Sequence, residues 1–326
     1  MDELILDILK QLRDGSQGAL DTHQLEMLIN SHNSGIDSSA HSTEREKLIP
    51  KRAILPYFLQ VKQNNDELWQ SWNVTPELEE RFIRSVRMKP RRTASGVATI
   101  TVITRPHTCS SNCIYCPCDL RMPKSYLANE PACQRAELTF FDPYVQVAAR
   151  LQALHQMGHS TDKVELIVLG GTWSDYPESY QYWFIKDLFR ALNEWPNSPN
   201  HIKERLNWYI SFGLQNSEEA LSSFVAEQQA AVFDDAATYN QAFHKLYDTS
   251  QPHQSAWSQM QSTYDELVEQ QHVNETAAAR VVGLVIETRP DTITPDNLRM
   301  FRQLGCTKIQ IGIQSTRQEI LDANQR

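Results

Sequence analysis

The sequence predicts an α/β protein: a parallel sheet with covering helices, preceded by a helical region. Before about residue 92 the apolar residues repeat at helical spacing, whereas from Val97 onward short β-rich runs alternate with helical patterns. Strands that alternate with helices indicate a parallel sheet, either open or closed into a barrel. Residues 215–274 interrupt this alternation. Because they are rich in Gln, Glu, Asp and Ala, we interpret them as a helical insertion.

Residues 1–92 are expected to form helices. A polar stretch from Asn33 to Glu46 resembles a linker. A later helix is predicted to begin at Pro76, since Thr75 suits the N-cap and proline suits the first helical position. The apolar stripes of the predicted helices are Leu4, Ile5, Ile8, Leu9 and Leu12, then Leu25, Leu28 and Ile29, then Leu78, Phe82, Ile83 and Val86.

A basic stretch closes this region and places six cations in twelve residues: Arg81, Arg84, Arg87, Lys89, Arg91 and Arg92. Lysine and arginine bind phosphates without regard to base sequence, so the stretch is a candidate RNA-binding face. A solvated helix face is the plain alternative. The formal net charge of −9 argues against nucleic-acid binding through bulk charge, which leaves a local basic face as the route.

The sheet is predicted from four β-rich runs: residues 97–103, 164–169, 281–286 and 308–313. One helix begins at Asp142-Pro143 and ends at Gly158, and another runs from Tyr182 to Leu192. A third is capped by Thr294 and ends at Gly305. In sheets of this kind the chemistry lies at the carboxyl ends of the strands, and the cysteine, glycine and glutamate motifs described below each follow a strand.

Four of the six cysteines lie between Cys109 and Cys118, directly after the first predicted strand. Such clustering indicates metal ligation or catalysis, because six cysteines are too few for a disulfide scaffold in this chain. Cys109, Cys113 and Cys116 have the C-x-x-x-C-x-x-C spacing that is typical of radical S-adenosylmethionine (SAM) enzymes. Three thiolates in a short loop can hold a [4Fe–4S] cluster and leave one iron free to chelate SAM.

Zinc is the alternative occupant of these cysteines, with Cys118, Cys133 or His107 as the fourth ligand. Structural zinc sites usually pair two short Cys-x-x-Cys elements across a longer gap, which does not match the spacing here. Two other functions therefore stay open at this point: a zinc-bearing RNA-binding module without catalysis, and a radical SAM enzyme with another substrate. With a cluster in place, Cys118, Cys133 and Cys306 are interpreted as ordinary small residues.

Three further positions follow strands and are candidates for binding SAM. Gly170-Gly171-Thr172 ends the second strand, where glycines let backbone carbonyls approach a ligand without a Cβ in the way. Glu287 ends an apolar strand, where a lone carboxylate is costly unless it is paired. Its partner is expected to be cationic SAM, with an ion pair to Arg289 as the alternative. Gln314, after the fourth strand, is a weaker candidate for a hydrogen bond to SAM.

Four segments together resemble the Elongator protein 3 family, the catalytic Elongator subunit: residues 89–96, the cysteine loop, residues 162–173 and residues 286–291. The resemblance runs from about Lys51 to the last residue, and Arg121–Tyr126 with Gly170–Trp173 points to the bacterial branch. Residues 1–50 are uninformative on this resemblance. With the apolar periodicity and the basic stretch, we expect residues 1–92 to form a helical, tRNA-binding region. Residues 93–326 would form a radical SAM (β/α) barrel that is incomplete at its C-terminus.

The resemblance implies a transferase that installs a carboxymethyl group, or its precursor, on carbon 5 of the wobble uridine of tRNA, using acetyl-CoA and SAM. By resemblance alone, Lys163 matches an acetyl-CoA-contacting lysine. Family members also carry a C-terminal acetyltransferase-like domain, which we expect this chain to lack. Tyr115 and Trp173 are candidates for stacking on a base or on adenine, with core packing as the equal alternative.

The remaining expectations concern location and partners. No apolar run approaches the roughly 18 residues that cross a bilayer, and the N-terminus lacks the basic and apolar regions of a signal peptide. We therefore expect a cytoplasmic protein without membrane contact. An electron donor must reduce the cluster, and a homodimer is compatible with the sequence.

Overall fold

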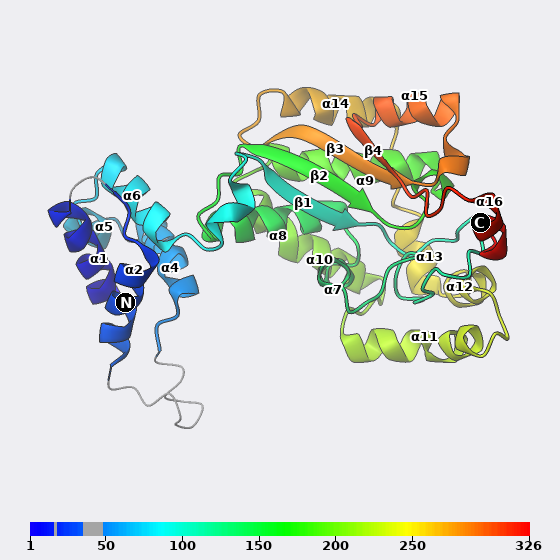
Figure 1. Ribbon diagram of the computed structural model, residues 1–326, viewed down its shortest axis with the longest axis horizontal. Coiled ribbons are helices and arrows are strands. Elements are labelled where there is room, and N and C mark those ends of the chain that lie inside the picture. Colours follow the sequence, from blue (N-terminus) through cyan, green and yellow to red (C-terminus); the bar gives the residue numbers. More distant parts are fainter. Residues whose placement is uncertain (16–17, 35–47) are drawn as a thin grey trace. The chain divides into compact units, whose positions relative to one another are not determined.

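The computed structural model describes residues 1–15, 18–34 and 48–326, which divide into two compact units (Figure 1). The first unit comprises Met1–Gly96 with Ala153–Thr161, and the second comprises Val97–Gln152 with Asp162–Arg326. Of the predicted polar linker, residues 35–46 lie outside the described residues. Within the described part of the chain, no helix is long and apolar enough to cross a membrane.

The first unit is helical. Its described elements are α1 (Asp2–Asp14), α2 (Thr22–Asn33), α4 (Lys51–Asn64), α5 (Asp66–Ser71), α6 (Pro76–Val86) and the 3-10 turn η1 (Pro90–Thr93). The two helices predicted first are confirmed as α1 and α2. The helices bury an apolar core in which the Phe58 ring stacks on Trp72 and on Phe82, with ring centroids 5.9 and 4.1 Å apart.

Two helices of this unit show how far local sequence determines helix position. The predicted start of α6 is confirmed, because the Thr75 hydroxyl accepts a hydrogen bond from the Leu78 backbone at 3.2 Å. The sequence does not predict α4, since Pro56 lies inside it and proline normally interrupts a helix. Leu55 and Phe58 are buried on either side of Pro56, so packing outweighs the lost backbone hydrogen bond.

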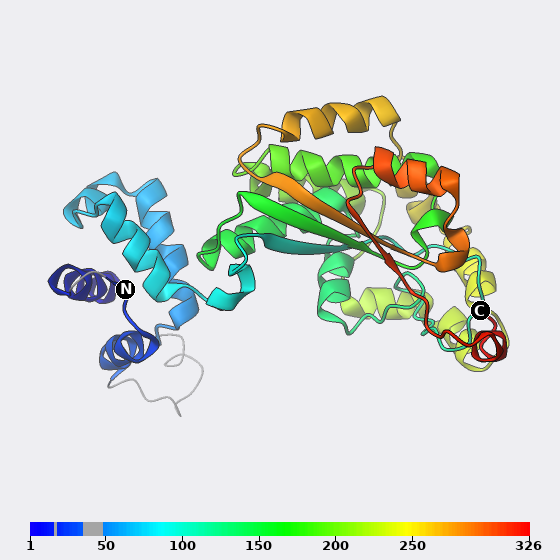
Figure 2. The ribbon, with the colours of Figure 1, turned by 45° about the horizontal axis from the view of Figure 1, so that its top comes forward.

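The second unit contains a parallel sheet that has four strands among the described residues, in the order β1 (Ala98–Ile103), β2 (Lys163–Leu169), β3 (Arg280–Thr288) and β4 (Lys308–Ile311). Val102 lies opposite Val168, and Val168 lies opposite Ile286. The strands lie side by side in both views (Figures 1 and 2). The α/β fold with a parallel sheet is therefore confirmed, whereas closure into a barrel stays a prediction.

Helices connect the successive strands of this sheet, and one more helix follows the last described strand. They are α7 (Pro131–Leu138) and α8 (Pro143–Gln156) before β2, α9 (Glu178–Asn193) and α10 (Ile202–Ser211) after it, α15 (Pro295–Gln303) before β4, and α16 (Gln318–Ala323) after it. Residues 215–274 contain α11 (Glu218–Phe233), α12 (Tyr239–Tyr247), α13 (Gln251–Trp257) and α14 (Tyr264–Asn274). Because α14 packs on α9 and α9 on β3, α14 belongs to the helical layer over the sheet.

Candidate functional site

A pocket lies at the carboxyl ends of the strands. Its lining includes most of the residues predicted to bind a cluster and SAM: Cys109, Cys113, Cys116, Gly171, Thr172, Glu287 and Gln314. These residues follow or end all four described strands. Parallel strands present their carboxyl ends at one edge of a sheet, which explains why segments so far apart in the sequence converge here.

The turn after β2 requires glycine at two positions. Gly170 has a φ of +145°, and a Cβ there would lie 1.8 Å from the Thr104 hydroxyl oxygen. That hydroxyl is held by the Tyr176 hydroxyl at 2.7 Å, so it has little room to move. Gly171 has a φ of +64°, which also favours glycine, and it lines the pocket. Gly170 therefore shapes the turn from outside the pocket, whereas Gly171 faces the ligand space.

Cys113 is buried beside two hydrogen-bond donors. Its Sγ lies 3.0 Å from the Ser111 hydroxyl and accepts a hydrogen bond from the Arg289 guanidinium at 3.2 Å. Burial alone would raise the pKa of the thiol, but the hydrogen bonds from Ser111 and Arg289 lower it to about 7. A thiol with this pKa is readily present as the thiolate, which is the form that binds metals.

Cys109 and Cys116 each face a hydroxyl group across the pocket. The Sγ of Cys109 lies 3.5 Å from the Thr172 hydroxyl, and the Sγ of Cys116 lies 3.1 Å from the Ser125 hydroxyl. Hydroxyl donors stabilise a thiolate in the same way that they stabilise other anions. The sequence motif contains neither hydroxyl, so this polar surrounding could not be predicted from the cysteine spacing.

Glu287 is fixed by a tyrosine. The Tyr126 hydroxyl donates a hydrogen bond to Glu287 Oε2 at 2.6 Å, and burial together with this carboxylate raises the pKa of Tyr126. The alternative of an ion pair between Glu287 and Arg289 is wrong, because Arg289 pairs instead with Asp291 at 2.6 Å. Glu287 thus presents to the pocket a carboxylate that accepts one hydrogen bond, from the uncharged Tyr126 hydroxyl.

Side chains on helices α11 and α12 form hydrogen bonds with the backbone of the cysteine loop and of the residues that follow it. The Asn240 amide on α12 accepts a hydrogen bond from the Cys109 backbone nitrogen at 3.1 Å and donates one to its backbone oxygen at 2.8 Å. Gln229 on α11 makes the same paired contact with the Leu120 nitrogen and the Cys118 oxygen, both at 2.8 Å. The region predicted as an insertion is therefore part of the scaffold of the site.

The residues that the structure describes include no group of three or more His, Cys, Asp or Glu side chains that could hold a metal ion as they are placed. The proposed fourth ligands for zinc have other contacts. His107 Nε2 lies 3.0 Å from the Asp175 backbone oxygen, and burial lowers the pKa of His107 to about 4. The Cys118 thiol donates to the Cys116 backbone oxygen at 3.4 Å. Cys133 is fully buried on α7, where burial raises its pKa to about 12.

The sequence is similar to proteins named tRNA uridine(34) acetyltransferase. It is 33% identical to that of Methanocaldococcus infernus over 253 residues, which cover 76% of this chain and 35% of the relative. For the Methanocaldococcus jannaschii protein the identity is 31% over 265 residues, covering 79% and 36%. Elongator complex protein 3 of Schizosaccharomyces pombe is 28% identical over 254 residues, covering 74% and 34%.

This chain is a partial homologue of the Elongator protein 3 family. It spans 35% and 36% of the length of the two archaeal relatives. A solved structure of the archaeal Methanocaldococcus infernus Elp3 with an N-terminal deletion is 27% identical; it covers 70% of this chain and 31% of that chain, with a TM-score of 0.38. No protein-family model matches the sequence.

Lys163, which the Elongator protein 3 resemblance matches with an acetyl-CoA contact, lies away from the thiols. It is exposed and forms the first residue of β2, opposite Arg280. From Lys163 to Leu169 the strand rises about 20 Å, and the pocket lies at the far end. The structure therefore does not bring Lys163 into the pocket that holds the other predicted residues.

Two aromatic residues of the Elongator protein 3-like motifs have different environments. Trp173, on the 3-10 turn η2 (Trp173–Asp175), is buried and contacts the Phe184 ring at 5.9 Å between centroids, so core packing is the correct alternative. Tyr115 is 40% exposed and lines the pocket, and its hydroxyl accepts a hydrogen bond from Arg326 at 2.6 Å. Tyr115 alone stays a candidate for stacking.

The basic stretch of this Elongator protein 3 homologue falls into two groups. Arg81 donates to the Gly18 backbone oxygen at 2.9 Å, Arg84 pairs with Glu80 at 2.6 Å, and Arg87 is half-buried. The other group surrounds η1 and is exposed, with no acidic partner among the described residues: Lys89, Arg91 and Arg92. The exposed group offers the charges that a phosphate backbone could reach.

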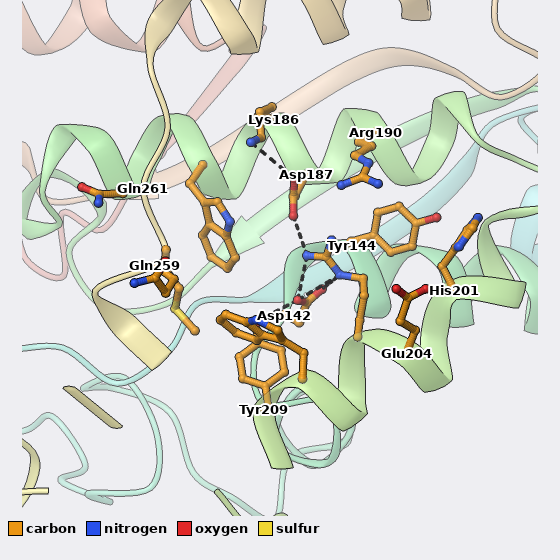
Figure 3. A pocket seen from close by; sticks show the side chains of 14 residues that line it. Asp142, Tyr144, Lys186, Asp187, Arg190, His201, Glu204, Tyr209, Gln259 and Gln261 are labelled. Atoms are coloured by element: carbon orange, nitrogen blue, oxygen red, sulfur yellow. Dashed lines mark hydrogen bonds and ion pairs between the residues drawn. The ribbon is translucent and has the colours of Figure 1, made fainter. Parts of the chain in front are cut away.

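A second pocket, of about 410 Å³, lies between α9, α10 and the start of α8 (Figure 3). The Arg205 guanidinium on its wall bridges two buried carboxylates, at 2.8 Å from Asp142 and 2.5 Å from Asp187. The Tyr209 hydroxyl donates to Asp142 at 2.8 Å. Burial raises the pKa of Asp187, although Arg205 opposes that rise. None of the predicted cluster or SAM residues lines this pocket, so it plays no part in the site described above.

Proposed function

We propose that this chain is the radical SAM part of a transferase that modifies carbon 5 of the wobble uridine of tRNA, with acetyl-CoA as co-substrate. The observation that carries the proposal is the convergence of three cysteines, Gly171-Thr172, Glu287 and Gln314 on one pocket. The names of the relatives support the substrate, since they are tRNA uridine(34) acetyltransferases.

The chemistry of the donor set fits a [4Fe–4S] cluster. Such clusters are held by cysteine thiolates, and three thiols from one short loop line the same pocket. Cys113 has a lowered thiol pKa, and each of the three sulfurs has a nearby hydroxyl. When bound, the cluster supplies an electron to the sulfonium of SAM and leaves one iron for chelation of its methionine end.

The other pocket residues bind and orient SAM. Gly171 exposes backbone to the pocket without a Cβ, and Glu287, oriented by Tyr126, presents a carboxylate to the cationic cofactor. Gln314 contributes an amide from the segment after β4. These groups lie at or just beyond the carboxyl ends of three strands, so the sheet holds them on one side of the pocket for orienting the cofactor against the thiols.

Iron and sulfide content after anaerobic reconstitution is the first test. The chain should take up about four irons and four sulfides and become brown. It should then cleave SAM under reducing conditions, and tRNA should accelerate that cleavage. A rate of SAM cleavage that tRNA does not change would indicate a radical SAM enzyme with another substrate. A colourless protein that contains stoichiometric zinc would refute the proposal.

Exposed cations should provide the salt-dependent part of tRNA affinity. Each phosphate contact contributes about 0.7–0.9 to the slope of log affinity against log salt, so replacing Lys89, Arg91 and Arg92 by glutamine should flatten that slope by roughly 2–3. Filter binding of labelled tRNA across a salt series measures the slope.

The matched control replaces three other exposed cations by glutamine: Lys10, Arg52 and Lys203. It changes the net charge by the same amount, so it separates a local contact from bulk electrostatics. Equal slopes for the two triple variants would show that the cations around η1 are only a solvated surface.

A further inference from the structure

Lys124 is a buried cation in the wall of the thiol pocket. It is 4% exposed and lines the pocket together with the cysteines. Its Nζ donates to the Ser111 backbone oxygen at 2.8 Å and lies 6.0 Å from the centre of the Tyr239 ring. Within the described part of the chain, no carboxylate lies at ion-pair distance from it. An ammonium group carries three donors, and burial without an anion is costly.

The segment that carries Lys124 contacts the pocket on several sides. The Ser125 hydroxyl lies 3.1 Å from Cys116 Sγ, and the Tyr126 hydroxyl binds Glu287. A Cβ on Gly171 would lie 3.5 Å from the Lys124 backbone oxygen, so the two backbones approach closely. Ser125 has a φ of +88°, a conformation that non-glycine residues adopt only where surrounding contacts impose it. Lys124 is therefore held in place rather than free to reach solvent.

The other charged groups of the pocket are already engaged or have the opposite sign. Arg289 is bound to Asp291 and to the Cys113 thiol, and Arg326 is bound to Tyr115 and to the Gly312 backbone oxygen. Glu287 is the acidic residue in the lining. Lys124 and Arg326 are thus the two pocket cations whose partners are neutral, and Lys124 is the more buried of the two. Because an anion gains most from a cation that is shielded from water, Lys124 is the stronger candidate for binding one.

We infer that Lys124 binds the carboxylate of the methionine end of SAM, an inference that rests on the proposed function. That end of SAM carries one carboxylate beside its cationic groups. Lys124 matches the carboxylate and Glu287 matches the cations, so the charges of pocket and ligand are complementary. Lys124 is then a residue that selects for an intact amino-acid end, in addition to the cluster iron.

Equilibrium dialysis of SAM against the anaerobically reconstituted full chain tests this role. Lys124→Met should weaken SAM binding by roughly 10- to 100-fold, the loss of one charge-assisted hydrogen bond. Lys124→Arg should stay within a few fold of the unchanged protein. Decarboxylated SAM should bind the Lys124→Met variant and the unchanged protein about equally, because the group that Lys124 recognises is missing.

Iron content and a thermal melt of every variant separate the outcomes, with Lys186→Met in the second pocket as a control for loss of a partly buried lysine. The inference is overturned if Lys124→Met leaves the preference for SAM over decarboxylated SAM unchanged. It is equally overturned if the variant loses iron, because Lys124 would then serve the cluster.

Absence of iron and of SAM binding in the unchanged protein would instead refute the proposed function. Should Lys124→Met not fold, the arginine variant decides, since loss of SAM binding there with normal iron content contradicts a charge contact.

Discussion

Replacing Cys113 with alanine should leave the chain unable to hold a [4Fe–4S] cluster and should abolish SAM cleavage. Cys113 is the thiol with the lowered pKa, and it lies between Ser111 and Arg289 in the pocket. Two remaining thiolates cannot retain a cubane whose open iron must also hold SAM. Loss of an outer-shell partner of a metal ligand typically costs 10- to 100-fold in activity, so loss of the ligand itself should cost considerably more. Iron content and 5′-deoxyadenosine formation measure both effects.

Cys306→Ala is the matched control for that experiment. Cys306 is as buried as Cys113, but its thiol donates to the Lys308 backbone oxygen at 3.2 Å and lies outside the pocket lining. Its removal should leave the iron content unchanged. A Cys113→Ala protein that keeps its iron and still cleaves SAM would contradict the assignment of the site, whatever the control does.

The predicted site follows from features that are local in the sequence. The cysteine spacing, the glycines after β2 and the carboxylate at the end of β3 each occupy a few consecutive residues next to an apolar run. Parallel topology then brings the strand ends together, so the sequence is enough to predict that Cys109, Gly171 and Glu287 line one pocket. Lys163 shows the limit of this reasoning, because a lysine before a strand is at the wrong end of the sheet.

Contacts between distant segments could not be predicted in the same way. Asn240 forms hydrogen bonds with the Cys109 backbone although the two residues are 131 positions apart in the sequence. The neighbouring sequence does not distinguish Asn240 from other asparagines in a polar helical region. Arg81 illustrates the same point on the first unit. Its position on a basic helix face suggests phosphate binding, whereas its guanidinium binds the Gly18 backbone oxygen. The sequence shows which residues are cationic. Only the packed structure shows which of them are already bound by other groups of the protein and which can bind a phosphate.

The two carboxylates that line the second pocket and share Arg205 lead to the prediction with the largest effect on stability. Arg205→Met should lower the free energy of unfolding by about 3–5 kcal/mol, because it removes the cation that the buried Asp142 and Asp187 share and leaves Asp187 only the longer contact with Lys186 at 3.9 Å. Arg299→Met removes an equal charge from an exposed pair with Asp296 and should cost less than about 1 kcal/mol. Urea unfolding of both variants measures the difference.

The pH dependence of the same variant provides an independent check on the cause. Burial already holds the pKa of Asp187 above its unfolded value, so the native state takes up that proton before the unfolded chain does. A raised carboxyl pKa favours the native state below the unfolded pKa, and this contribution is lost as the pH rises through the folded value. Removing Arg205 raises that pKa further, so the deficit of Arg205→Met should shrink as the pH falls from neutral. A deficit that stays constant with pH would mean that lost packing of the arginine side chain, rather than loss of the cation shared by the two carboxylates, destabilises the variant.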